Sequence, residues 1–95
     1  MPDLPALLCV DDDADVLRAV ARDLRTRYGD DYRVLRAGGG EEALDAVREL
    51  DRRGQTVALL LSDQRMPQMD GVRFLAQAAE VFPRAKRVLR HLASV

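Results

Sequence analysis

Two short acidic stretches of this sequence could do chemistry together. The stretch CVDDDADVL (residues 9–17) has Asp11 and Asp12 directly after an apolar run, and LLLSDQRMPQMDG (residues 59–71) ends another apolar run at Asp63. If the two runs are neighbouring parallel strands, the three carboxylates converge, and such like charges raise one another's pKa unless a cation lies among them. Mg²⁺ prefers oxygen ligands of this kind and also binds phosphate oxygens. An aspartate held beside Mg²⁺ is suited to attack a phosphoryl group.

Each stretch also has a simpler interpretation. The cluster DDDAD alone is typical of a solvated helix start, with Asp13 as the cap and Asp15 favoured by the helix dipole. An apolar run that ends in aspartate also occurs in nucleoside triphosphatases, but the required G-x-x-x-x-G-K-[ST] loop is absent, and the glycines at 38–40 lack its lysine. Met66 and Met69 are interpreted as loop packing rather than as ligands.

Four apolar segments are predicted to be the strands that position these carboxylates. Ala6–Val10 and residues 57–61 are short, continuous and apolar, which is typical of strands buried on both faces of a parallel sheet. Residues 32–37 alternate apolar and basic side chains over part of their length, which predicts a strand nearer an edge. A fourth strand is predicted at residues 85–92.

Apolar residues three or four positions apart predict three helices between these strands. Gly29 and Gly54 are predicted to end the first two helices, because glycine readily adopts left-handed backbone angles. Asp70 is predicted to cap the third helix. The predicted buried faces contain Leu17, Val20, Leu24 and Tyr28, then Ala43, Val47 and Leu50, then Val72, Leu75, Ala79 and Phe82. Such alternation predicts an α/β fold with a doubly wound parallel sheet and a functional crevice at the carboxyl ends of its strands.

Composition limits the function further. The 95 residues suffice for one small core, and 47% apolar with 33% charged residues favour a globular domain. The longest apolar stretch is too short to span a membrane, which predicts a cytoplasmic location and no membrane partner. A net charge of −1 with scattered basic residues argues against nucleic-acid binding. The single cysteine, Cys9, is interpreted as a small buried hydrophobic residue.

Together, CVDDDADVL and SDQRMPQMDG at this spacing resemble the receiver domain of bacterial two-component response regulators, over about residues 6–88. The resemblance implies a flavodoxin-like fold with strand order 2-1-3-4 and Asp63 as the phosphoacceptor. It implies Mg²⁺ bound by Asp12 directly, by Asp11 through water, by Asp63 and by the backbone carbonyl of Arg65. It further implies a sensor histidine kinase or phosphotransfer protein as partner. Such a domain is not an enzyme in the usual sense, although it assists its own phosphorylation and dephosphorylation.

The sequence departs from this family near its end. The family has five strands and five helices, and this chain is expected to lack the last strand, the final helix and the lysine that follows the fifth strand. Where the family carries Thr or Ser and then a small residue, residues 89–92 read LRHL, with His91 in place of the hydroxyl. We interpret His91 as a surface residue and Arg87, Arg90 and His91 as charges on an edge strand. Apolar surface left on this side predicts a homodimer through strand four.

Three functional hypotheses follow. The first is a single receiver domain over residues 1–95, with its core at about 6–92 and no output domain, acting in a phosphorelay either alone or as part of a longer protein. The second is a truncated pseudo-receiver that serves only in protein interaction or dimerisation, without phosphotransfer. The third, a metal-dependent phosphohydrolase, is weaker, because haloacid-dehalogenase-type enzymes have an aspartate two positions after the nucleophile and this sequence has Arg65 there.

Overall fold

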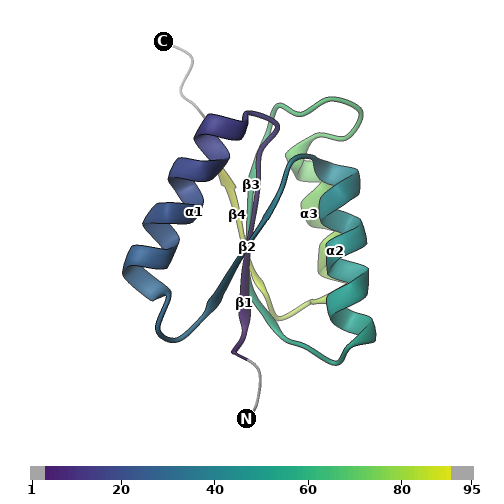
Figure 1. Cartoon of the computed structure of the whole chain (residues 1–95). Helices are drawn as coiled ribbons and strands as arrows, with labels where there is room; N and C mark the ends of the chain where they lie inside the picture. Colours follow the sequence, from purple (N-terminus) through teal and green to yellow (C-terminus); the bar gives the residue numbers. More distant parts are fainter. Residues whose placement is uncertain (1–3, 91–95) are drawn as a thin grey trace.

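The computed structural model describes residues 4–90 as one parallel sheet covered by helices on both faces (Figure 1). The sheet has four strands in the order β2-β1-β3-β4. The fold class and the strand order 2-1-3-4 predicted from the sequence are therefore confirmed. In chain order the elements are β1 (Ala6–Val10), α1 (Ala14–Tyr28), β2 (Arg33–Ala37), α2 (Gly40–Arg52), β3 (Val57–Asp63), α3 (Gly71–Val81) and β4 (Lys86–Arg90). Residues 91 and 92 of the predicted fourth strand, including His91, lie outside the described residues.

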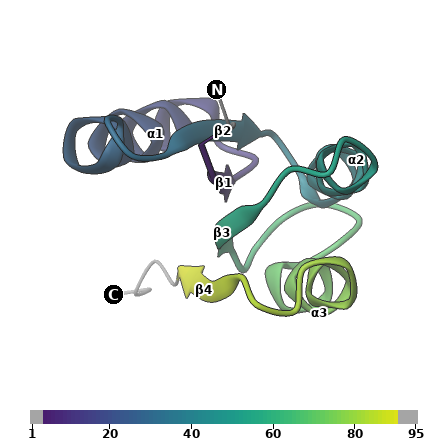
Figure 2. The same ribbon diagram turned by 90° about the horizontal axis from the view of Figure 1, so that it is seen from below.

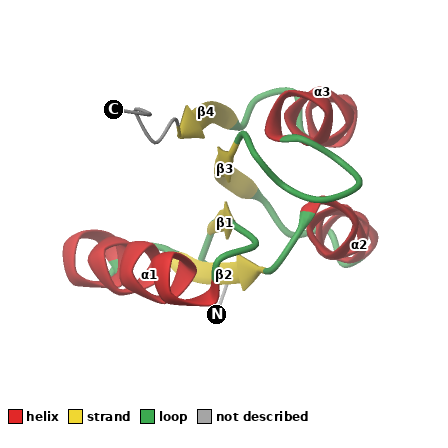
Figure 3. Ribbon diagram, turned by 90° about the horizontal axis from the view of Figure 1, so that it is seen from above, coloured by secondary structure: helices red, strands yellow, loops and turns green. Residues whose placement is uncertain are grey.

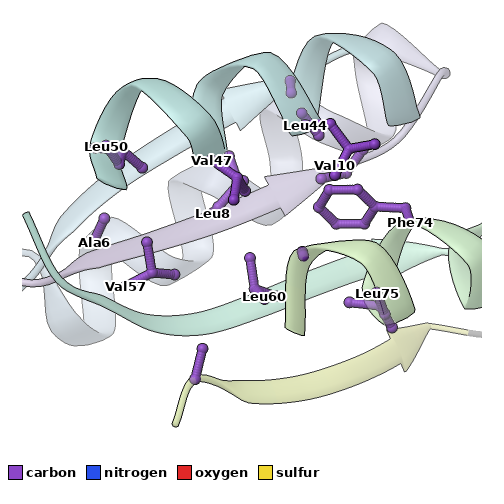
Figure 4. Packing of buried hydrophobic residues seen from close by; sticks show 14 residues of the cluster. Ala6, Leu8, Val10, Leu44, Val47, Leu50, Val57, Leu60, Phe74 and Leu75 are labelled. Carbon is purple, nitrogen blue, oxygen red and sulfur yellow. The ribbon is translucent and has the colours of Figure 1, made fainter. Parts of the chain in front are cut away.

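The helices form two unequal layers around the sheet. Helices α2 and α3 lie together on one face, and α1 lies on the other face beside β2 and β1 (Figure 2). Because side chains alternate along a strand, the side chains of Leu8 and Val10 enter the layer under α2 and α3. There they join Val47, Leu60 and Phe74 in the main hydrophobic core (Figure 4). None of the helices within residues 4–90 is long and apolar enough to cross a membrane.

The two strands predicted to be central differ in burial. All five residues of β1 are buried, as predicted. In β3, however, Leu59 and Leu61 are only half-buried. The physical reason is that α1 packs on β2 and β1 and leaves this face of β3 without a described helix over it. The prediction that both faces of β3 are buried is therefore wrong for this half of the strand.

Cys9 occupies the interior of β1, as predicted. Its side chain is buried, and its thiol donates a hydrogen bond to the carbonyl oxygen of Leu35, 3.3 Å away. Burial raises the pKa of the Cys9 thiol, so the neutral form is favoured. Cys9 therefore serves as a small core residue.

The predicted helix faces are correct for α2 and partly wrong for α1 and α3. Ala43, Val47 and Leu50 of α2 are buried as predicted. Tyr28 at the end of α1 is exposed, and Val72 of α3 is 55% exposed. The residues of α3 that are buried are Gly71, Phe74, Leu75 and Ala78, and Phe82 lies just past the end of the helix.

Two predicted helix ends have different physical origins. Gly54 has φ +70°, so glycine relieves the left-handed backbone there, as predicted. Gly29 has φ −63°, which is right-handed, so the prediction of a left-handed cap is wrong at this position. Glycine is nevertheless required, because a Cβ atom on Gly29 would collide with the backbone carbonyl of Arg25. The reason for glycine at this position is therefore the close approach of the Arg25 carbonyl, not a left-handed backbone.

We predict that Phe74→Ala destabilises the protein severely. Phe74 is the largest fully buried side chain, and Figure 4 shows its ring reaching from α3 toward Val10 of β1. Removing a buried phenylalanine ring costs about 3–5 kcal/mol, a large part of the roughly 5–15 kcal/mol by which a domain is stable. Urea denaturation followed by circular dichroism measures the loss. Val72→Ala, in the same helix but exposed, is the matched control, and equal losses for the two variants would contradict this packing.

Candidate functional site

Three carboxylates meet at the carboxyl edge of the sheet. Strands β1 and β3 are neighbours with Val10 opposite Ser62, so Asp11 and Asp63 follow at the same level. Figure 3 looks down on this edge, where β1 and β3 lie side by side between the two helical layers. One oxygen from each of Asp11, Asp12 and Asp63 lies within 4.8 Å of the others. The structure thus brings together the three carboxylates that the sequence analysis selected.

Asp11 is the most constrained of these carboxylates. It is only 5% exposed, and its Oδ1 accepts a hydrogen bond from the backbone N–H of Asp13 at 2.9 Å. Its Oδ2 lies 3.5 Å from Nη1 of Arg90. Burial raises the pKa of Asp11, and the negative charges of Asp63 and Asp12 raise it further, against the lowering effects of the Asp13 N–H and Arg90. The net direction is upward, so the folded state disfavours the ionised form of Asp11.

The start of α1 separates the capping aspartate of the DDDAD cluster from the convergent carboxylates. Asp13 caps the helix, because its Oδ1 accepts hydrogen bonds from the N–H groups of Asp15 (3.0 Å) and Val16 (3.2 Å). The simpler interpretation of the cluster is therefore correct for Asp13. It is incomplete for Asp11 and Asp12, which belong to the convergent carboxylates.

The backbone of Asp63 is held by the first turn of α3. A Cβ atom on Gly71 would collide with the backbone carbonyl of Asp63, so only glycine permits this close approach. The Gly71 N–H donates to the carbonyl oxygen of Gln64 at 3.0 Å, and Oδ1 of Asp70 caps the helix by accepting from the Arg73 N–H at 2.9 Å, as predicted. The Asp-Gly pair of the sequence thus fixes the helix start and the strand end together.

The loop after β3 forms one wall of an open cleft beside the carboxylates. The cleft has a volume of about 450 Å³, and Asp12, Arg65 and Pro67 are among its lining residues. The Arg65 side chain is exposed. Met66 and Met69 pack against the core, which confirms their interpretation as loop packing. Asp12 and the loop that contains the Arg65 carbonyl therefore face the same cleft.

Arg90 is a member of the site that the sequence analysis missed. Its interpretation as a charge on an edge strand is correct, because β4 is the outer strand of the described sheet, and Arg87 of the same strand is exposed. In addition, Arg90 lies level with Asp63 across the β3–β4 pair, and its guanidinium forms the ion pair with Asp11. The one signal in the sequence was its position at the carboxyl end of a strand, where the functional crevice of such a sheet lies.

The fold and the acidic edge define a receiver-type domain, and comparison with known proteins assigns the family. The chain belongs to the response regulator receiver domain family, whose model matches residues 7–89. Receiver domains act in two-component signalling and generally bind Mg²⁺ at an acidic pocket.

Several known proteins are similar to this chain. The hydrogenase transcriptional regulatory protein HoxA of Bradyrhizobium diazoefficiens is 37% identical over 83 residues, which are 87% of this chain and 15% of that protein. The chain therefore spans about 15% of the length of this curated relative. Among solved structures, the receiver domain of the hybrid histidine kinase CckA is 30% identical with a TM-score of 0.70, and the match covers 95% of this chain and 87% of that one. A CheY-like receiver domain protein of Methanospirillum hungatei JF-1 is 25% identical with a TM-score of 0.78, over 98% of this chain and 68% of that one.

The residues present fit a hard divalent cation. Three carboxylates offer oxygen ligands within 4.8 Å of one another, and burial together with the negative charges of Asp63 and Asp12 raises the pKa of Asp11. Mg²⁺ accepts one or two protein carboxylates and keeps several waters, which suits a cleft that is open on the side of Asp12. The donor set thus agrees with the family's acidic pocket.

We predict that Asp11→Asn stabilises the metal-free protein at pH 7. Because the pKa of Asp11 is raised in the folded state, folding binds its proton more tightly, and its contribution to stability falls as pH rises through that pKa. The variant should therefore melt at a higher temperature than the natural protein at pH 7, by about 4–8 °C for each kcal/mol gained. The gap should close below the ordinary aspartate pKa of 3.8, where the natural Asp11 is protonated in both states.

Thermal melts in chelator-treated buffer from pH 3 to pH 8 measure this gap. Asp23→Asn, at an exposed position of α1, is the control for removing one negative charge from the surface. A lower melting temperature for Asp11→Asn at pH 7 would mean that the ion pair with Arg90 outweighs the cost of burying the carboxylate.

Proposed function

We propose that this receiver domain accepts a phosphoryl group on Asp63 in a Mg²⁺-dependent reaction. A sensor histidine kinase or a phosphotransfer protein is the proposed donor. The observation that carries this proposal is the convergence of Asp63 with Asp11 and Asp12 at the carboxyl end of β3, in a chain of the receiver family. Asp63 is 8% exposed, and the open cleft next to it along the chain is lined by Asp12, Gln64 and Arg65 among others.

The proposed transfer is a displacement at phosphorus. A carboxylate oxygen of Asp63 forms the new O–P bond, the bond from phosphorus to the donor's histidine nitrogen breaks, and that nitrogen keeps the electron pair and takes a proton. Mg²⁺, when bound, neutralises charge on the transferring oxygens. Asp12, Asp11 through water, Asp63 and the Arg65 carbonyl are the proposed ligands. The remaining work is positioning, which Gly71 and Gln64 provide by holding the end of β3 against α3.

The same site is proposed to return Asp63 to its free state. Water that reaches the open cleft attacks phosphorus, the O–P bond to Asp63 breaks, and inorganic phosphate leaves. The domain would thereby assist both its own phosphorylation and its own dephosphorylation, as a signalling domain rather than an enzyme with a separate substrate. Residues 1–95 are proposed to form one receiver unit. A cytoplasmic location and a lack of nucleic-acid and membrane partners stay predictions from the sequence.

We predict that incubation with Mg²⁺ and acetyl phosphate adds one phosphoryl group to the intact protein. The carboxylate of Asp63 is the nucleophile, so Asp63→Ala should abolish the addition, and chelation of Mg²⁺ should abolish it in the natural protein. Intact mass spectrometry detects the adduct. Asp45→Ala, an exposed aspartate on α2, should gain the same mass as the natural protein.

Further arms of this experiment separate the functional hypotheses. Asp12→Ala should lose more Mg²⁺ affinity than Asp15→Ala in calorimetric titration, because Asp12 belongs to the convergent carboxylates and Asp15 does not. No adduct with acetyl phosphate, phosphoramidate or a phosphorylated histidine donor would refute phosphotransfer and favour the interaction-module hypothesis. Adduct formation in Asp63→Ala would place the acceptor elsewhere.

We further propose that two copies of the domain pair through the sheet face beside α1. An apolar groove of about 400 Å³ lies there, lined by Leu7, Leu24, Leu59, Leu61 and Val88 among others. Helix α1 packs over β2 and β1, so the half of this face on β3 and β4 carries apolar side chains that no described helix covers. A two-fold symmetric pair would bring this patch against its own copy, which makes the second copy a matching occupant.

For this pairing we predict a rise in hydrodynamic mass toward that of a dimer as concentration increases through the micromolar range. Val88→Glu should keep the protein monomeric, because a charge at the contact must lose its water. Val72→Glu, on the exposed side of α3, is the matched control. Analytical ultracentrifugation measures the masses, and a natural protein that is monomeric throughout this range would refute the pairing.

A further inference from the structure

Arg90 brings a positive charge into the acidic edge. Its side chain is 33% exposed, and Nη1 is buried, 3.5 Å from Oδ2 of Asp11. Within residues 4–90, no group accepts a hydrogen bond from this Nη1. A buried donor without an acceptor is costly, because it has given up its hydrogen bond to water. The guanidinium of Arg90 is therefore attracted by the charge of Asp11, but its Nη1 has no hydrogen-bond acceptor among the described residues.

The strand order fixes where this guanidinium lies. Strand β3 runs between β1 and β4, as Figure 3 shows from above. An ion pair between Arg90 at the end of β4 and Asp11 after the end of β1 must therefore cross the end of β3. Asp63 lies at that end, level with Arg90 in the β3–β4 register. The side chain of Arg90 thus passes the end of β3, where Asp63 lies, to reach Asp11.

The guanidinium of Arg90 has a donor that its ion pair with Asp11 leaves unused. Oδ1 of Asp11 accepts the N–H of Asp13, and Oδ2 is the oxygen that faces Arg90. Nη1 of Arg90 makes no hydrogen bond with this oxygen or with another described group, so it is available to an acceptor close to Asp63. A phosphoryl group on Asp63 offers three acceptor oxygens and nearly two negative charges, which the planar fork of arginine binds well.

We propose that Arg90 donates hydrogen bonds to the oxygens of the phosphoryl group on Asp63, an inference that rests on the proposed function. In the free domain Arg90 lies against Asp11, and in the phosphorylated domain it moves to the phosphoryl group. Arg90 is then a binding residue for the acyl phosphate. It supplies from the end of β4 the positive charge that three carboxylates alone cannot give.

Binding of beryllofluoride, a phosphoryl mimic that attaches to aspartate without phosphotransfer, tests this assignment. The natural protein, Arg90→Gln, Arg90→Lys and Arg87→Gln are titrated by nuclear magnetic resonance at saturating Mg²⁺. Arg90→Gln should weaken binding at least about tenfold, as expected for loss of a charge-assisted hydrogen bond. Arg90→Lys, which keeps the charge but loses the fork, should bind with intermediate affinity. Arg87→Gln removes the same charge from an exposed position of the same strand and should stay within about twofold of the natural protein.

The outcomes distinguish this inference from the proposed function. Arg90→Gln with natural affinity for beryllofluoride, while the natural protein still gains a phosphoryl group, overturns the role of Arg90 and leaves the proposed function intact. An equal loss in Arg90→Gln and Arg87→Gln also overturns it, because general charge would explain both. A natural protein that neither binds beryllofluoride nor gains a phosphoryl group refutes the proposed function, and the role of Arg90 with it. If Arg90→Gln does not fold, Arg90→Lys decides: an affinity below that of the natural protein supports the assignment, and natural affinity overturns binding by the arginine fork.

Discussion

The parallel pairing of β1 with β3 is the constraint on which the rest of this structure depends. The register begins with Ala6 opposite Val57 and then moves to Leu7 opposite Leu59, so β3 has one extra residue, Ala58, near its start. Because of this irregularity, every later residue of β3 pairs with β1 one position earlier than the Ala6–Val57 pair alone would set. Val10 consequently lies opposite Ser62. If the register continued unbroken from the Ala6–Val57 pair, Asp11 would lie opposite Ser62, and Asp63 would extend one position beyond Asp11.

Carboxylates that lie side by side at the ends of buried strands reduce the stability of the folded protein. Asp11 is buried because β1 is central, and burial is the largest cause of its raised pKa. The surrounding structure tolerates this cost through contacts that do not involve charge. Gly71 packs against the backbone of Asp63, and the buried Ser62 hydroxyl donates to the carbonyl oxygen of Asp63 at 2.9 Å. The scaffold therefore fixes the positions of the carboxylates while leaving their repulsion for ligands to relieve, as in many functional sites.

The sequence predicts local features well and features that depend on register poorly. The strands and the positions of Asp11 and Asp63 at their ends were predictable, because continuous apolar runs that end at aspartates are strong local signals. The strand order, and with it the convergence of the carboxylates, was implied by the resemblance to receiver domains, because apolar runs do not say which strands are neighbours. The buried face of α3 was not, because Val72, Phe74 and Leu75 are all apolar and more than one face satisfies the spacing. The steric crowding that requires Gly29 was likewise not predictable. In a sequence, a glycine that permits a left-handed backbone at a helix end cannot be told from one that avoids a clash with a neighbouring carbonyl. Arg90 was missed because only the pairing of β3 with β4 reveals that it is level with Asp63.

The balance of charge explains why one arginine matters at this edge. With all three carboxylates ionised, Arg90 leaves the pocket with two uncompensated negative charges, which a divalent cation matches. A phosphoryl group on Asp63 replaces one negative charge with about 1.5 to 2. A pocket that holds both the Arg90 guanidinium and a divalent cation then stays within about one charge of neutrality. Without Arg90 the same pocket would carry one further negative charge in each state, at a position where burial already disfavours the ionised form of Asp11. Because Arg90 reaches the pocket from the strand beside Asp63, its ion pair with Asp11 connects the acidic edge to β4.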